Sequence, residues 1–251
     1  MILRNVHWIR VISNILFCGT KSPSSKKRSK DTVMHGLGST IMATHWPRFL
    51  VNGVTRTLPR PYKKCQPNGV GWFLMKESWF CNIVHLLEKL VFQYLDKIDK
   101  NEHTLQVISD LKKTKSIVPE SLRISNSIFT QMTITTSNGS QNMATHVDDG
   151  DIIGAVINLG EVTNGGATLY FDKKDDSKKG KCSYRIDFEH GRIQIGFFDK
   201  VYHCVESFEG VRFGLNFNVK KDVLRHFEEY GTKYYNQLID NDFDGEFFLA
   251  R

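Results

Sequence analysis

The chain has 251 residues, 40% of them hydrophobic and 12% aromatic, which is enough to bury the core of one large or two small globular domains. No window approaches the roughly 18 consecutive apolar residues of a transmembrane helix, and the five scattered cysteines lack a C-x-x-C pair, which argues against a disulfide framework or a structural zinc site. The net charge of +7 lies wholly in residues 1–64, where twelve Lys or Arg stand against the single acid Asp31. We therefore expect a folded protein without a transmembrane segment, in a reducing intracellular compartment.

Residues 1–45 are expected to form a basic, disordered leader. Residues 1–18 contain Arg but no acid, as organelle transit peptides do, and residues 26–30 form a Lys/Arg run typical of nuclear localisation signals. A leader without any targeting role explains the same composition, because a Ser- and Lys-rich segment buries too little apolar surface to fold. Nuclear or organellar targeting thus stays open, and the basic arm is also suited to contact with acidic partners.

Residues 46–119 are predicted to be a helical flanking region packed outside the core. From residue 76 to residue 98 the apolar residues recur at intervals of three and four, which predicts an amphipathic helix. A second, shorter helix is predicted over residues 103–113, ending before Pro119.

Residues 120–220 have the pattern of a β domain, with short β-rich runs separated by Gly, Asn and Asp turn residues. Strands are predicted near residues 128–136, 143–147, 152–159, 166–172, 183–188, 191–197, 201–206 and 211–219. Eight short strands at this spacing predict a sandwich or jelly roll. Residues 221–251 are predicted to form a C-terminal helix, over about 221–230, and a tail. The expected class is therefore mainly β with flanking helices, an α+β architecture.

His146 and Asp148 are candidate metal ligands on the second predicted strand. Side chains at i and i+2 of a strand share a face, so both can point toward His203 on the seventh predicted strand. Two imidazoles and one carboxylate on one face form the triad that binds non-haem Fe(II) and leaves positions open for other ligands. The tetrapeptide MATH also occurs earlier, but there His45 is followed two residues later by Pro47, which binds no metal.

The other charged residues near this motif are interpreted more simply. Asp149 and Asp151 are predicted to form a solvated turn after the second strand. The alternative is that they line the mouth of the site and receive a basic or polar substrate. The run of mixed charge at residues 172–181 is predicted to be an exposed loop.

Arg212 stands in the otherwise apolar eighth strand, GVRFGLNFNV. A buried arginine needs an anionic partner, because burying an unpaired charge is very costly. That partner is either a bound anion or a nearby Asp or Glu on an outer face of the strand. The pattern alone leaves both interpretations open.

Together, His146, Asp148, His203 and Arg212 resemble the Fe(II)/2-oxoglutarate-dependent dioxygenase superfamily, whose fold is a double-stranded β-helix, or jelly roll. The resemblance covers about residues 120–220. It implies that the triad is catalytic and binds Fe(II), and that Arg212 binds the remote carboxylate of the cosubstrate 2-oxoglutarate. It further implies O2 at the remaining metal position and ascorbate as a reductant.

The run at residues 165–171, GGATLYF, resembles the GG-x-T strand of the prolyl 4-hydroxylase branch, which implies that Thr168 also binds the cosubstrate. Other positions depart from that branch. Prolyl 4-hydroxylases usually carry Lys in place of Arg212, and many members with Arg have Ser in place of Gly214. A Tyr of the first strand is often the other carboxylate partner in the superfamily. The candidates that this chain offers for that role are Gln131 and Thr133.

The resemblance implies an oxidoreductase that hydroxylates a macromolecule and releases succinate and CO2. A protein side chain is the first predicted substrate, because the GGAT strand is prolyl hydroxylase-like. A nucleic-acid base or N-alkyl group is the second, as in the TET/JBP and AlkB branches, with the basic arm contacting phosphates. A hypothesis of another class is a non-catalytic jelly-roll binding module, in which His146 and His203 are structural.

Overall fold

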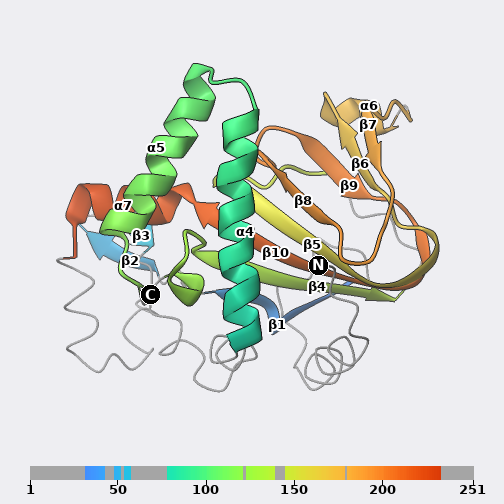
Figure 1. Ribbon diagram of the computed structural model, residues 1–251, viewed down its shortest axis with the longest axis horizontal. Coiled ribbons are helices and arrows are strands. Elements are labelled where there is room, and N and C mark those ends of the chain that lie inside the picture. The colour runs from blue at the N-terminus through green and yellow to red at the C-terminus, as the bar shows by residue number, and fades with distance from the viewer. Residues whose placement is uncertain are drawn as a thin grey trace. The chain divides into compact units, whose positions relative to one another are not determined.

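The computed structural model describes residues 32–42, 48–51, 54–57, 78–120, 123–138, 145–178 and 180–232 (Figure 1). The chain divides into two compact units, one of Met1–Ile41 and Met132–Asn218 and the other of Met42–Gln131 and Val219–Arg251. Among the described residues, no helix has both the length and the apolar character needed to cross a membrane. All four residues that carried the functional prediction belong to the first unit: His146, Asp148, His203 and Arg212.

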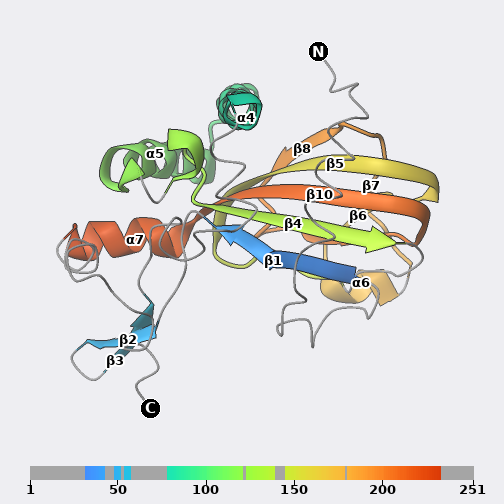
Figure 2. The same ribbon diagram turned by 90° about the horizontal axis from the view of Figure 1, so that it is seen from below.

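The first unit contains two β sheets, of five and three strands, in the orders β1-β4-β10-β5-β8 and β7-β6-β9. The strands of the larger sheet, side by side in Figure 2, are β1 (Thr32–Met42), β4 (Gln131–Asn138), β5 (Asp151–Gly165), β8 (Ile193–Gly196) and β10 (Phe208–Lys220). Those of the smaller sheet are β6 (Thr168–Phe171), β7 (Tyr184–Ile186) and β9 (Tyr202–Val205). The short helix α6 (Lys174–Lys178) follows β6.

The order of the strands defines a double-stranded β-helix. β5 pairs with β8, and β6 pairs with both β7 and β9, always antiparallel. The segment at His146 joins the smaller sheet through an antiparallel bridge to His203 of β9. The core has eight segments along the chain: β4, the His146 segment, β5, β6, β7, β8, β9 and β10. If they are numbered from one to eight, one sheet has the order 1-8-3-6 and the other has the order 2-7-4-5. This is a jelly roll, and the predicted fold class is confirmed.

The strand β5, which lies between β10 and β8, is buried on both faces. Nine of its first ten residues are buried, from Asp151 to Gly160, and only Val156 is partly exposed. A strand covered on both sides has no solvent face that would require alternating polar residues. This explains why its sequence IIGAVINL is a continuous apolar run in which Asn158 is the one polar residue.

The second unit is mainly helical. Its elements are α4 (Ser78–Lys97), α5 (Glu102–Ile117), the 3-10 turn η3 (Ile124–Asn126), α7 (Lys221–Tyr230) and the hairpin of β2 (Arg48–Val51) and β3 (Val54–Thr57). Most of the apolar stripe predicted for α4 faces inward: Leu87, Val91 and Leu95 are 0% exposed, whereas Leu86 is 49% exposed. Asn101 caps α5 by accepting a hydrogen bond from the Thr104 N–H at 2.9 Å.

Two parts of the predicted domain organisation need correction. Residues 32–42, inside the expected disordered leader 1–45, form β1, which pairs with β4. The expected helical region 46–119 also contains the β2–β3 hairpin. Both segments gain backbone hydrogen bonds from a neighbouring strand, and such pairing leaves little trace in the local apolar pattern. His45 and the targeting motifs at residues 1–30 lie outside the described residues.

Candidate metal centre

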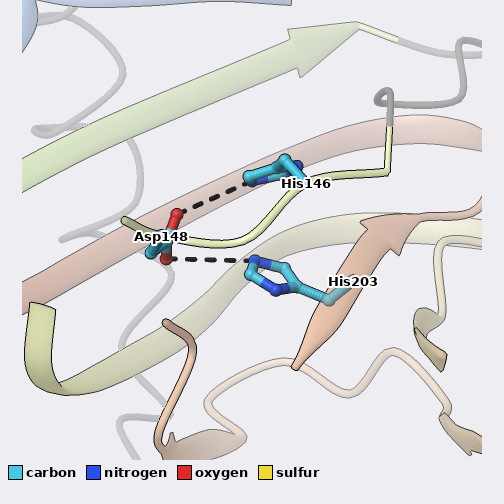
Figure 3. Close-up of side chains that lie close together, drawn as sticks. All are labelled: His146, Asp148 and His203. Carbon is cyan, nitrogen blue, oxygen red and sulfur yellow. Dashed lines mark ion pairs between the residues drawn. The ribbon is translucent and has the colours of Figure 1, made fainter. Parts of the chain in front are cut away.

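The three side chains predicted as metal ligands meet at one point of the first unit. One ligand atom from each of His146, Asp148 and His203 lies within 4.8 Å of the others. Asp148 faces both imidazoles, with Oδ1 3.7 Å from Nε2 of His146 and Oδ2 3.9 Å from Nε2 of His203 (Figure 3). These separations are longer than a hydrogen bond. The carboxylate therefore does not hydrogen-bond to either of these nitrogens, and all three ligand atoms can converge on an ion.

Backbone hydrogen bonds place these side chains. The His146 N–H donates to the His203 carbonyl at 3.0 Å, and the His203 N–H donates back to the His146 carbonyl at 2.8 Å. The two ring centroids are 4.5 Å apart as a result. The Asp148 N–H donates to the Phe198 carbonyl at 2.9 Å, so the loop between β8 and β9 fixes the backbone at the carboxylate. Within the described residues, the strand predicted at 143–147 is reduced to this single bridge.

The environment of His203 decides which of its nitrogens can bind a metal. Nδ1 lies 3.0 Å from the Val201 carbonyl oxygen, and because a carbonyl only accepts, Nδ1 carries the hydrogen. Burial lowers the pKa of His203, which favours the neutral ring. The lone pair of Nε2 therefore faces an oxygen of the Asp148 carboxylate. This arrangement is repulsive unless a cation lies between the two atoms, and it is the orientation typical of metal-binding histidines.

Phe198 contacts two of the three metal-ligand residues, His203 and Asp148. Its ring packs against His203 with centroids 5.5 Å apart, while its carbonyl holds the Asp148 N–H. The ring lies against Gly154 of β5, where an added Cβ would come within 2.6 Å of Phe198 Cδ2. A glycine at position 154 is therefore needed for Phe198 to reach both metal-ligand residues.

Gly154→Ala is expected to weaken metal binding by roughly 10-fold or more, the usual effect of disturbing the residues that orient metal ligands. The added methyl group displaces the Phe198 ring and with it the backbone contact to Asp148. Gly196→Ala is the matched control, because a Cβ there meets the same ring at an ordinary 3.5 Å. Titration with Mn(II), followed by electron paramagnetic resonance, measures the affinity. Equal Mn(II) affinities for the two variants would show that Phe198 does not position the ligands.

Arg212, on β10, is 8% exposed and lacks an ionic partner among the described residues. Its Nη2 donates to Oδ1 of Asn158 at 2.8 Å and, over a longer 3.4 Å, to Oγ1 of Thr168. Burial lowers the pKa of Arg212 to about 10, against a small opposing influence of the Tyr170 phenol. Nη1 of Arg212 and Nδ2 of Asn158 are buried without a hydrogen-bond partner among the described residues. These unpaired donors favour a bound anion over the alternative of an Asp or Glu partner.

Two glycines bring Thr168 to Arg212. Gly165 and Gly166 have φ values of +71° and +77°, a region that side chains disfavour. A Cβ on Gly165 would also lie 2.1 Å from the Ser207 carbonyl oxygen. The Gly-Gly pair therefore lets the chain turn tightly into β6, whose first residue, Thr168, is 7% exposed and directed at Arg212.

Tyr170 and Gln194 connect the pair of Arg212 and Thr168 with the metal centre. The Tyr170 hydroxyl donates to Gln194 Oε1 at 2.5 Å, and Gln194 Nε2 donates to Thr168 Oγ1 at 3.2 Å. Tyr170 lies opposite His203 in the β6–β9 pairing, with ring centroids 6.1 Å apart. Burial raises the pKa of Tyr170, so its phenol stays protonated near neutral pH. A continuous row of polar side chains thus runs between the two sheets, from the metal centre to Arg212.

The structure brings most of the predicted site residues together. His146, Asp148 and His203 form one cluster, and Arg212 and Thr168 form a second. Gln131 and Thr133 stay predictions. Gln131, the first residue of β4, belongs to the second unit, and the side chain of Thr133 lies outside the described residues.

Sequence reasoning missed Asn158, Tyr170 and Gln194. A signal existed for each: Tyr170 follows Thr168 by two residues on β6 and so shares its face. Asn158 and Gln194 each stand as an isolated polar residue in an apolar strand, as Arg212 does. A buried strand with one polar side chain requires a partner for it.

The two acids after Asp148 differ in their environment. Asp149 is exposed, as a solvated turn predicts. Asp151, however, is 0% exposed and accepts a short hydrogen bond from Nδ2 of Asn218. The prediction of a solvated turn is therefore wrong for Asp151, because β5 begins at this residue and buries it beside β10.

Several solved structures are similar to this chain. NgTET1 in complex with 5mC DNA is 14% identical, over 86% of this chain and 67% of that chain, with a TM-score of 0.46. An oxidoreductase of the 2OG-Fe(II) oxygenase family from Burkholderia pseudomallei is 10% identical, over 86% and 80% of the two chains, with a TM-score of 0.43. A Pseudomonas putida prolyl-4-hydroxylase is 17% identical, over 36% and 50%, with a TM-score of 0.27. No protein-family model and no curated protein matches the chain.

These likenesses concern the fold, which the strand order already defines as a double-stranded β-helix. The chain thus has the fold expected from its resemblance to the Fe(II)/2-oxoglutarate-dependent dioxygenase superfamily. Because one fold supports many activities, its function has to be argued from the residues of the site.

Proposed function

We propose that the protein is an Fe(II)- and 2-oxoglutarate-dependent dioxygenase. The observation that carries the proposal is the convergence of His146, Asp148 and His203, whose ligand atoms lie within 4.8 Å of one another, with Nδ1 of His203 beside the Val201 carbonyl so that Nε2 faces Asp148. Two imidazoles and a carboxylate are the ligand set that suits non-haem Fe(II).

The residues of the chain would hold the metal and exclude competing ligands. His146, Asp148 and His203 supply three donors, and the metal, when bound, would supply the oxidative chemistry that converts 2-oxoglutarate and O2 to succinate and CO2 while a substrate is hydroxylated. The Val201 carbonyl keeps the His203 ring in the metal-binding tautomer. The ring of Phe198 covers one side of His203 and limits access of water there.

Arg212 and Thr168 are proposed to bind the remote carboxylate of 2-oxoglutarate. The buried, unpaired Nη1 of Arg212 fits an anion, which would form a charge-assisted hydrogen bond with it. Thr168 is two residues along β6 from Tyr170, the partner of His203, so the pocket lies about 7 Å along the strand from the metal centre.

A protein side chain stays the first proposed substrate. The support is the Gly165-Gly166 turn that begins β6, which resembles the prolyl 4-hydroxylase strand. A nucleic-acid base or N-alkyl group is the second candidate, supported by the basic character of residues 1–64. Both candidates use the same metal centre and cosubstrate pocket, so they differ only in what enters the site.

The proposal is tested by release of labelled succinate from 2-oxoglutarate in the presence of Fe(II) and ascorbate. We expect turnover that requires Fe(II) and rises when a suitable substrate is added. Ascorbate is expected to prolong turnover but not to be required for it. Proline-containing peptides form one arm, and methylated DNA and RNA oligonucleotides form the other. Turnover no greater than that of the Asp148→Ala variant would overturn the proposal, and stimulation by one arm only would identify the substrate class.

A further inference from the structure

A hydrogen-bonded row of five polar side chains, four of them buried and Tyr170 partly buried, leads away from the metal centre. In order, these are Tyr170, Gln194, Thr168, Arg212 and Asn158, linked at 2.5, 3.2, 3.4 and 2.8 Å. Gln194 is 7% and Asn158 1% exposed. They come from four strands of both sheets, β6, β8, β10 and β5. Such a row is stable only if its donors and acceptors match along its whole length.

The pairing of donors with acceptors determines toward which atom each hydrogen of the row points. Tyr170 donates to Gln194 Oε1, which leaves the Gln194 amide N–H to donate to Thr168 Oγ1. Thr168 Oγ1 also faces an N–H of Arg212. A hydroxyl has two acceptor lone pairs and one donor hydrogen. With both lone pairs taken by N–H groups, the Thr168 O–H has to donate to a further group.

Three donors are then left without an acceptor among the side chains of this row. They are the Thr168 O–H, Nη1 of Arg212 and Nδ2 of Asn158, the latter two buried and unpaired among the described residues. Asn158 and Thr168 both contact Nη2 of the same guanidinium, so all three donors lie around Arg212. A carboxylate, which only accepts hydrogen bonds, satisfies all three.

We propose that Asn158 is a direct third ligand of the bound carboxylate and that Tyr170 and Gln194 are positioning residues, which set the direction of the Thr168 hydroxyl. This inference rests on the proposed function and extends it to three residues that the resemblance does not assign. Tyr170 also packs beside His203, and it is linked to the carboxylate side of the site through Gln194. The row keeps the pocket arranged for an anion before the anion binds, which reduces the cost of ordering it.

A double-mutant cycle tests the positioning role. The variants are Tyr170→Phe, Thr168→Val and the double variant, and the measurement is the Kd of 2-oxoglutarate for the Mn(II)-loaded protein by calorimetry. Phe keeps the ring beside His203, so the Kd of Mn(II) is expected to stay unchanged. Each single change is expected to raise the Kd of 2-oxoglutarate about five-fold, the usual effect of one hydrogen bond. The double variant is expected to match Thr168→Val alone, since Tyr170 acts only through Thr168.

Tyr184→Phe is the matched control. Tyr184 is the cross-strand neighbour of Tyr170 on β7, but it is 65% exposed and lies outside the hydrogen-bonded row. Its change is expected to leave the Kd of 2-oxoglutarate as it is. Additive effects in the double variant, or an equal effect of Tyr184→Phe, would overturn the positioning role.

Asn158→Asp tests the direct ligand. The substitution keeps the size of the side chain and its contact with Arg212, but it replaces the donor Nδ2 with an anionic acceptor that repels a carboxylate. We expect binding of 2-oxoglutarate to fall more than 100-fold, with Mn(II) affinity retained. Unchanged affinity for 2-oxoglutarate would overturn the assignment of Asn158. If the wild-type protein binds Mn(II) but no 2-oxoglutarate, the proposed function itself fails, an outcome that is distinct from both of these.

Discussion

The Asp148→Ala variant is expected to lose Fe(II)-dependent turnover entirely and to bind Mn(II) more than 100-fold more weakly than the wild-type protein. Asp148 is the only carboxylate of the triad, and it faces both imidazoles at 3.7 and 3.9 Å. Without it, two neutral nitrogens are left to hold a divalent cation, and the charge that offsets the cation is gone. The loss should therefore appear in the binding of the metal alone, before any cosubstrate is added.

Asp149→Ala is the matched control for this prediction. Asp149 is the next residue in the chain and also an acid, but it is exposed and contributes no ligand atom to the cluster. Its removal changes the net charge in the same way as the removal of Asp148, so any general electrostatic effect on metal binding is shared. Equal Mn(II) affinities of the Asp148 and Asp149 variants would contradict the assignment of the triad.

The Arg212→Met variant is expected to bind 2-oxoglutarate more than 100-fold more weakly while retaining its affinity for Mn(II). Among the residues that the structure describes, the guanidinium is the cationic group in contact with Thr168 and Asn158, and its Nη1 is buried without a hydrogen-bond partner. Arg212→Lys is expected to recover part of the loss, because an ammonium keeps the charge but not the planar, two-pronged geometry. Calorimetric titration of the Mn(II)-loaded variants measures both effects.

The same substitution has a second expected effect, on stability. A buried guanidinium without a carboxylate partner is costly, as its lowered pKa of about 10 reflects. Replacement by Met should therefore raise the free energy of unfolding of the ligand-free protein by about 1 kcal/mol. If Arg212 instead stabilised the fold, its replacement by Met would lower the free energy of unfolding. Urea denaturation in the absence of 2-oxoglutarate distinguishes these outcomes.

Arg185→Ala is the control for both measurements. Arg185, on β7, is 47% exposed and pairs with Asp187 and Glu206 at 2.7 Å. Surface ion pairs of this kind contribute little to stability. The variant should bind 2-oxoglutarate as the wild-type protein does. If it weakened binding as much as Arg212→Met does, the effect would stem from overall charge and not from the pocket.

Local pattern was sufficient to predict much of this protein. The intervals of apolar residues predicted α4, and short β-rich runs bounded by turn residues predicted most strands, because these patterns act over a few neighbouring positions. The spacing of His146 and Asp148 also placed two ligands on one side of a short segment. Arg212 was recognised because a charge in an apolar strand requires a partner, whatever the rest of the fold is.

Only the tertiary structure could decide which distant residues complete each cluster. Gln194 is 26 residues from Thr168, and Asn158 is 54 residues from Arg212. Asp151 likewise becomes buried only because Asn218, 67 residues away, lies beside it. The sequence by itself determined the strand periods, the two-residue ligand motif and the need of Arg212 for an anion. The pairing of β5 with β10 and the packing of the two sheets decided which polar side chains meet, because those hydrogen bonds join strands whose local patterns carry no information about one another.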